Sequence, residues 1–139
     1  MHQVNYFGYV LGTPEEEPRV SKMSLNDLFR ELETVSEPET RKYMKIYAEI
    51  AKEHGLRLVK YEGGQHISRI VGPEEPEKIK ERFDAANRDQ RMGRLYSRLL
   101  EDWNEASGGD LFCNFTNCSS MDFGRFGSLE YIEQRRSEA

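Results

Sequence analysis

The sequence predicts an α/β fold with about three β/α units and a parallel sheet. Short segments rich in β-branched and aromatic residues alternate with longer segments whose apolar residues recur every three to four positions. Glycine or proline separates most of these segments. Because alternating strands and helices favour crossover connections, we expect the strands to be parallel. A chain of 139 residues has the length of one domain or of part of a larger one.

The first unit is predicted near the amino terminus. Residues 4–11 are aromatic and β-branched enough to form a strand, or its exit into a loop. Ser24 can cap the short helix that follows. The apolar positions of that helix have the spacing i, i+3, i+4 and i+7: Leu25, Leu28, Phe29 and Leu32.

A second helix is predicted to begin at residues 36–39 and to stop at Gly55. The sequence Ser-Glu-Pro-Glu at 36–39 has the pattern of a capping box with proline in the first turn, and glycine is a common helix stop. We expect the second strand at once, over 56–61. We expect the buried stripe of the helix to consist of Tyr43, Ile46, Tyr47 and Ile50.

The longest helical region is predicted over 76–106. The polar stretch 87–91 divides it by a kink or a break. Residues 111–115 form the third predicted strand, and a glycine-rich loop leads to a last helix that starts near 128–131. The expected buried residues of the long region are Ile79, Phe83, Ala86, Met92, Leu95, Tyr96, Leu99 and Trp103.

The run Lys-Tyr-Glu-Gly-Gly-Gln-His at 60–66 is the most informative feature of the sequence. The predicted strand ends there in the carboxylate of Glu62, two glycines, an amide and the imidazole of His66. Loops converge at the carboxyl ends of parallel strands, where active sites collect. Gly63 and Gly64 let the backbone turn sharply and leave space beside Glu62. This edge is therefore the candidate site.

Composition excludes several other classes. A net charge of −5 argues against a nucleic-acid or anionic-membrane partner. No apolar run approaches the length of a membrane span, no leader peptide is visible, and the location in the cell stays open. Cys113 and Cys118 are five positions apart and the histidines are scattered, which favours buried or free thiols over a zinc site.

Four segments of the chain match a known pattern: 61–66, 87–93 with Tyr96, 111–116, and 126–131. In these segments the chain resembles the C-terminal third of the (β/α)8 barrels of retaining glycoside hydrolases and their uncharacterised relatives. The first segment resembles the seventh strand, the second the helix after it, and the last two the eighth strand and its loop. The resemblance implies that residues 1–139 form a single region, the C-terminal part of a (β/α)8 barrel.

The resemblance also implies a chemistry. In that family the seventh strand ends in the nucleophilic glutamate, a position that Glu62 matches. A retaining glycosidase needs a second carboxyl group about 5–5.5 Å away as general acid/base. In the family it comes from the fourth strand, which this chain does not contain. Asp110 opens its strand at the wrong end of the barrel, and Glu130 more plausibly charges a helix amino terminus. We therefore expect no hydrolysis by this chain alone, and neither a cofactor nor a metal is implied.

The predicted substrate is a carbohydrate, and the candidate binding residues are Tyr61, Gln65, His66, Asn114 and Phe126. Each has a structural alternative. Glu62 can be a carboxylate held by an arginine or histidine, and His66 can brace a loop. Gln65 and Asn114 can satisfy backbone groups at strand ends.

Two functions remain from the sequence. One is a carbohydrate-active barrel fragment that carries the nucleophile, with enzymatic activity only in a full barrel. The other is a non-catalytic α/β module that binds a glycan or a protein partner. Three strands leave two sheet edges and apolar faces uncovered, so we expect self-association or association with the rest of a barrel.

Overall fold

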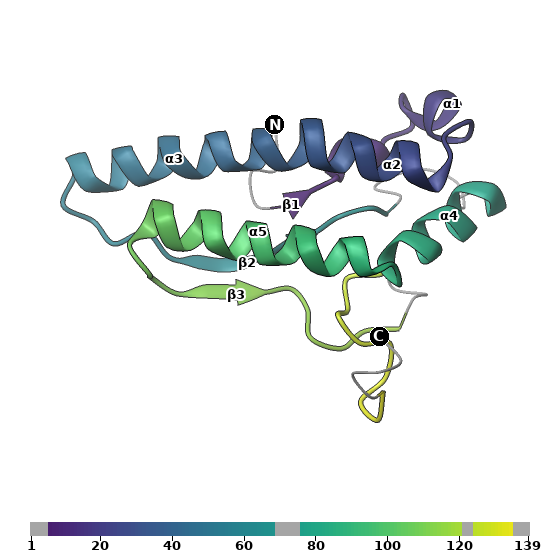
Figure 1. Cartoon of the computed structure of the whole chain (residues 1–139). Coiled ribbons are helices and arrows are strands. Elements are labelled where there is room, and N and C mark those ends of the chain that lie inside the picture. Colours follow the sequence, from purple (N-terminus) through teal and green to yellow (C-terminus); the bar gives the residue numbers. More distant parts are fainter. Residues whose placement is uncertain (1–5, 69–75, 121–123, 135–139) are drawn as a thin grey trace.

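The computed structural model describes residues 6–68, 76–120 and 124–134. Within these ranges the chain has a mixed α/β fold, as the sequence predicts (Figure 1). The elements are β1 (Tyr6–Phe7), the 3-10 helix η1 (Tyr9–Gly12), α1 (Glu17–Val20), α2 (Leu25–Glu31), the π-helix η2 (Leu32–Ser36), α3 (Glu37–Glu53), β2 (Lys60–Gln65), α4 (Glu77–Asn87), α5 (Gln90–Ser107) and β3 (Phe112–Asn114).

The strands of the sheet follow the order of the chain, β1-β2-β3, and both pairs are parallel. The parallel sheet of the prediction is thus confirmed. β1 pairs with the end of β2, where Tyr6 lies beside Gly64. β3 pairs with β2 beginning at the first residue of each strand, where Lys60 lies beside Phe112. β2 is therefore the middle strand.

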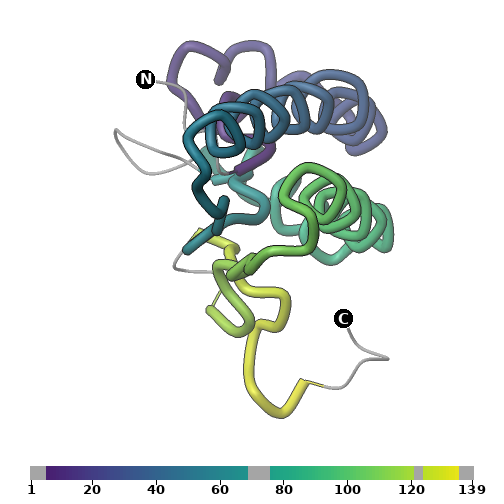
Figure 2. Tube along the Cα trace, turned by 90° about the vertical axis from the view of Figure 1, so that its left-hand side faces the viewer, coloured from purple at the N-terminus to yellow at the C-terminus, as the bar shows by residue number. Residues whose placement is uncertain are grey.

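The two long helices cover the same face of this sheet. The end view in Figure 2 shows α3 and α5 side by side, with the strands on one side of them. Lys60 of β2 points toward this helical layer, because its Nζ lies 5.7 Å from the ring centre of Trp103 on α5. Burial lowers the pKa of Lys60 to about 8. Side chains alternate along a strand, so the exposed Tyr61 points to the opposite face.

The helical region 76–106 has the predicted break and the predicted buried faces. Asn87 ends α4 and the side chain of Asp89 caps α5 by accepting the backbone N–H of Arg91. Tyr96 is partly buried, and its ring meets that of Phe7 of β1 at 5.7 Å. The other predicted residues of the two faces are all buried: Ile79, Phe83, Ala86, Met92, Leu95, Leu99 and Trp103.

The predicted buried stripe of α3 is wrong. Ile46, Tyr47 and Ile50 are 38%, 44% and 45% exposed, whereas Met44 and Ala51 are buried. Met44 belongs to the hydrophobic core, and Arg41 and Lys45 of α3 pair with α5. The apolar periodicity of α3 therefore marks a stripe of large side chains that is not the side facing the core.

The predicted position of the second strand is also wrong by about four residues. The strand is Lys60–Gln65, while Leu56 and Val59 are 66% and 52% exposed. The strand position is decided by pairing on both sides rather than by apolar content. Glu62 therefore lies inside β2 and not after its end.

Three smaller predictions concern the ends of elements. Ser24 caps α2 as predicted, and Asp27 completes a capping box. The capping box expected at Ser36 is wrong, because Ser36 has helical dihedrals and η2 joins α2 to α3. The first strand is shorter than residues 4–11, of which 4–5 lie outside the described ranges. Gly8 has φ of 82° and turns the chain into η1.

No helix forms at 128–131, and the helix-terminal role expected for Glu130 is wrong. Leu129 instead makes an isolated bridge with Cys118. Glu130 pairs with Arg88 at the end of α4, with Nε–Oε1 and Nη2–Oε2 distances of 2.5 and 2.9 Å. The last segment is therefore a loop that packs back onto the α4–α5 junction.

A polar seam joins α3 to α5. Arg41 Nε lies 2.9 Å from Asp102 Oδ1, and Lys45 Nζ lies 3.4 Å from Glu105 Oε1. Glu37 lies beside Asp102, and its burial together with that neighbouring carboxylate raises the pKa of Glu37 to about 6. Arg41 and Arg98 oppose this rise. Ionised Glu37 is thus less stable in the folded chain than in water.

This seam predicts how stability depends on pH. A raised carboxyl pKa means that the folded chain holds a proton that the unfolded chain loses, so stability falls as pH rises from about 4.5 to about 6. Glu37→Gln should be more stable than the wild type above pH 6, by about 1 kcal/mol after allowance for solvent screening. The two should converge near pH 4.5. Thermal melts across this range test it, and parallel profiles would contradict it.

Candidate functional site

The end of β2 gathers residues that the sequence singles out. Glu62 is partly buried on this middle strand, near enough to Tyr6 on β1 for its charge to act on the Tyr6 hydroxyl. Burial, and next the charge of Glu62, raise the pKa of Tyr6, so the phenol keeps its proton. Tyr6 and the carboxylate of Glu62 therefore lie close together on neighbouring strands.

His66 lies between two aromatic rings just after β2. Its ring stacks on Phe126 at 5.0 Å and on Tyr9 at 5.3 Å between ring centroids, and Tyr6 tilts against it at 5.5 Å. Burial lowers the pKa of His66 to about 4, so the imidazole is neutral at neutral pH. Its buried Nδ1 has no hydrogen-bond partner in the described part of the chain. The ring contacts favour the bracing role for His66 and bring Phe126 to the site.

Gln65 is completely buried, and its side chain bonds within the protein. Nε2 donates to Asn87 Oδ1 at 3.3 Å and to the carbonyl oxygen of Arg125. Oε1 accepts the backbone N–H of Ile67 at 2.7 Å. A direct contact between Gln65 and a ligand would require some of these bonds to break. The geometry favours the backbone-satisfying alternative for this residue.

Asn114 is exposed at the end of β3, beside Gly63. Its amide nitrogen donates to Thr116 O at 3.2 Å and to Ser128 Oγ at 3.3 Å. Both bonds tie the strand end to the C-terminal loop, while the amide oxygen faces Gly64. Asn114 thus belongs to the same edge as Glu62, with its two donors in use.

The face of the sheet opposite the helices carries exposed apolar groups. Tyr61 is 76% exposed and Leu111 60% exposed. Phe115 is also exposed, and its ring meets Phe126 edge-on at 5.6 Å. Tyr61 and Phe115 therefore offer open aromatic surface on this side of the sheet.

Neither alternative carboxylate can serve as an acid partner of Glu62. Asp110 precedes β3 and binds Arg57, with Nε–Oδ1 at 3.0 Å. The strand pairing places it about 13 Å from the level of Glu62 along the sheet. Arg88 holds the pKa of Glu130 below its usual range, whereas a general acid needs a raised pKa.

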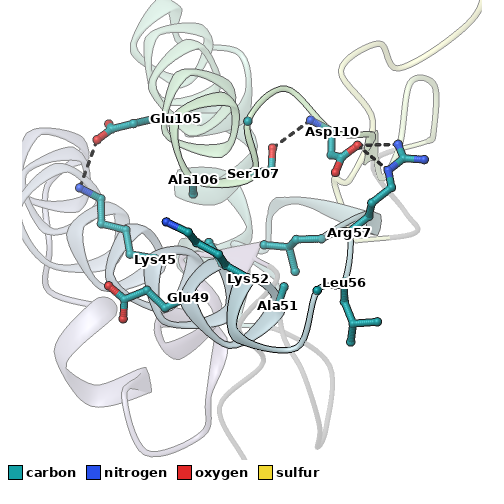
Figure 3. A pocket seen from close by; sticks show the side chains of 14 residues that line it. Lys45, Glu49, Ala51, Lys52, Leu56, Arg57, Glu105, Ala106, Ser107 and Asp110 are labelled. Carbon is teal, nitrogen blue, oxygen red and sulfur yellow. Dashed lines mark hydrogen bonds and ion pairs between the residues drawn. The ribbon is translucent and has the colours of Figure 1, made fainter.

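The described residues line a larger and a smaller cavity. The larger, of about 730 Å³, lies between the carboxyl ends of α3 and α5, as Figure 3 shows. Its charged groups include the ion pairs Lys45–Glu105 and Arg57–Asp110, so the charges of these side chains neutralise one another. A smaller cavity of about 270 Å³ lies beside Tyr96 and Ser128. The larger cavity is at the opposite end of the sheet from Glu62.

Some residues of the site were not predicted from the sequence. Tyr9 and Phe115 complete the aromatic cluster around His66 and Phe126. Each follows the carboxyl end of a strand by one or two positions, which is the signal that could have identified them. The sequence predicts Tyr96 only as a buried residue of the helix. In the structure its hydroxyl also accepts a hydrogen bond from the backbone N–H of Gln65 at 3.1 Å.

Comparison with known protein families, curated proteins and solved structures finds no match for this chain. Within the described ranges, no group of three His, Cys, Asp or Glu side chains could hold a metal ion. Cys113 and Cys118 are free thiols. No described helix is long and apolar enough to cross a bilayer. The functional argument therefore starts from the geometry of the site.

Gly64 is the position where the site tolerates no side chain. It has φ of 151°, and an added Cβ would lie 2.8 Å from Tyr96 Oη and 3.0 Å from Asn114 Oδ1. We expect Gly64→Ala to lower the free energy of unfolding by about 3 kcal/mol. Urea denaturation measures this loss.

Gly93→Ala is the matched control. Gly93 is in α5 with open space around it, so alanine should stabilise the chain by about 0.5–1 kcal/mol. A Gly64→Ala variant as stable as the wild type would contradict the close packing at this edge.

Proposed function

We propose that this chain is the nucleophile-bearing part of a carbohydrate-active (β/α)8 barrel, with Glu62 as the nucleophile. The sheet supports this proposal, since its strands follow chain order and both crossover helices lie on one face. That is the local arrangement of strands and helices in a (β/α)8 barrel. A barrel needs about 250 residues, so this chain would supply only a part of it.

The single observation that carries the proposal is the position of the Glu62 carboxylate, whose charge acts on the neighbouring Tyr6 of β1. Glu62 lies within β2, the middle strand of the parallel sheet, three residues before its carboxyl end. The open rings of Tyr61 and Phe115 can stack on a sugar, because a pyranose ring presents apolar C–H groups on its face.

The expected chemistry is displacement at the anomeric carbon. A carboxylate oxygen of Glu62 forms a bond to C1 as the bond from C1 to the leaving oxygen breaks. With a natural glycoside, the leaving oxygen needs a proton from a second carboxyl group, and neither Asp110 nor Glu130 is suited to supply it. The chain alone should therefore fail on natural glycosides.

A second function is supported by the exposed aromatic face. Tyr61 and Phe115 could bind a glycan without any covalent step. In that case Glu62 only accepts hydrogen bonds from sugar hydroxyls. The two functions differ in whether a covalent glycosyl adduct forms.

An activated substrate distinguishes them. In a 2,4-dinitrophenyl 2-deoxy-2-fluoroglycoside, the dinitrophenolate leaves with the bonding electron pair and needs no proton. We expect a panel of such glycosides to add one fluoroglycosyl group to Glu62 of the wild-type chain, as detected by intact and peptide mass spectrometry. Tyr6→Phe should slow the labelling about tenfold, because it removes the polar hydroxyl next to the carboxylate of Glu62.

Glu62→Gln should abolish labelling and leave the melting temperature close to that of the wild type. Glu130→Gln is the matched carboxylate control and should be labelled at the wild-type rate. Labelling that survives Glu62→Gln would remove Glu62 from the nucleophile role. Glycan binding without any adduct would favour the non-catalytic function instead.

A further inference from the structure

The outward flank of α3 is an unusual surface for a helix in a small domain. Tyr43, Ile46, Tyr47 and Ile50 form one apolar stripe along it, and the last three are 38–45% exposed. We name these four residues the α3 stripe.

The α3 stripe faces away from the helical neighbour. Arg41 and Lys45 of α3 pair with α5 through Asp102 and Glu105. At about 100° per residue, Ile46 and Ile50 lie about 160° and 120° around the helix axis from the buried Met44. α5 therefore covers one side of α3, and the α3 stripe lies on another.

The α3 stripe is complementary to itself. Its positions are symmetric about the midpoint between residues 46 and 47. A second copy, antiparallel and related by a two-fold axis through that midpoint, would place Tyr43 opposite Ile50 and Ile46 opposite Tyr47. Each ring then covers an aliphatic side chain of the other copy, and each contact occurs twice, as a two-fold interface requires.

The charges beside the α3 stripe favour the same arrangement. Lys42, Glu49 and Glu53 are exposed along one border of it, and none has an ion-pair partner in the described part of the chain. The antiparallel axis brings Lys42 to within about 3 Å, measured along the helix, of the levels of Glu49 and Glu53 in the other copy. Two Lys–Glu clusters, one at each end, would then flank the apolar contact.

We propose that the chain forms a two-fold homodimer through antiparallel packing of the α3 stripe against its counterpart. The proposal does not depend on Glu62 or on carbohydrate binding. Four side chains per copy bury less than the roughly 800 Å² per partner of a standard interface, so the dissociation constant should be on the order of 10 µM.

Sedimentation equilibrium of the whole chain from about 1 to about 500 µM tests the proposal. The wild type should shift from monomer to dimer. Ile46→Glu should raise the dissociation constant by at least about a hundredfold, because it places two unpaired charges at the two-fold axis. Ile132→Glu is the matched control, since Ile132 is 82% exposed but lies outside the α3 stripe, and it should dimerise like the wild type. Because both positions are exposed, both variants should melt near the wild-type temperature.

Disulfide trapping tests the direction of packing. With Cys113 and Cys118 replaced by serine, the double variant Tyr43→Cys/Ile50→Cys should form covalent dimers on mild oxidation. Ile50→Cys alone should not, because the two copies of residue 50 would be about 10 Å apart along the helices.

The proposal would be overturned if the wild type stayed monomeric at all concentrations, which would mean that the α3 stripe serves some other partner. It would also be overturned if the Ile46→Glu variant still formed the dimer. Equal trapping of the single and double cysteine variants would contradict the antiparallel packing. None of these results bears on the labelling of Glu62.

Discussion

The buried amide of Gln65 is the interaction on which the arrangement of the site depends. Its side chain joins the end of β2 to α4 through Asn87 and to the C-terminal loop through the carbonyl of Arg125. Its backbone N–H reaches α5 through Tyr96. A buried amide that loses its partners costs about 1–3 kcal/mol for each unsatisfied group, so these segments must be in place together. The position of Glu62 relative to the loop then follows from the same bonds.

The sequence predicted burial best for helices whose own apolar pattern determines which side packs against the core. The faces of α4 and α5 were predicted correctly because each carries a single apolar stripe and meets the core with it. α3 has two stripes, and the buried one includes Thr40 and Ala51, which give little periodic signal. The start of β2 was misplaced for a related reason. Its register depends on β1 and β3, which lie far away along the chain.

For the candidate site, the sequence could identify residues on one strand, and it could not identify the partners that other segments supply. Glu62 and His66 stand out because of the carboxylate, glycines and imidazole near one strand end. Their partners could not be read from that run, since Tyr6 comes from another strand and Phe126 from a distant loop. The burial of Gln65 was equally hidden, because it results from the path of residues near Arg125. The accessibility of these side chains to a ligand depends on how the strand ends and the C-terminal loop pack together.

The order of the strands has a consequence for how such a chain can change over evolutionary time. Each strand pairs with the strand next to it in the sequence, and the crossover helices share one side. A further β/α unit could join at the side of β1 that no described strand pairs with, without separating any described pair. Duplication of a gene segment that encodes one such unit would therefore extend the sheet by a whole step and preserve every older contact.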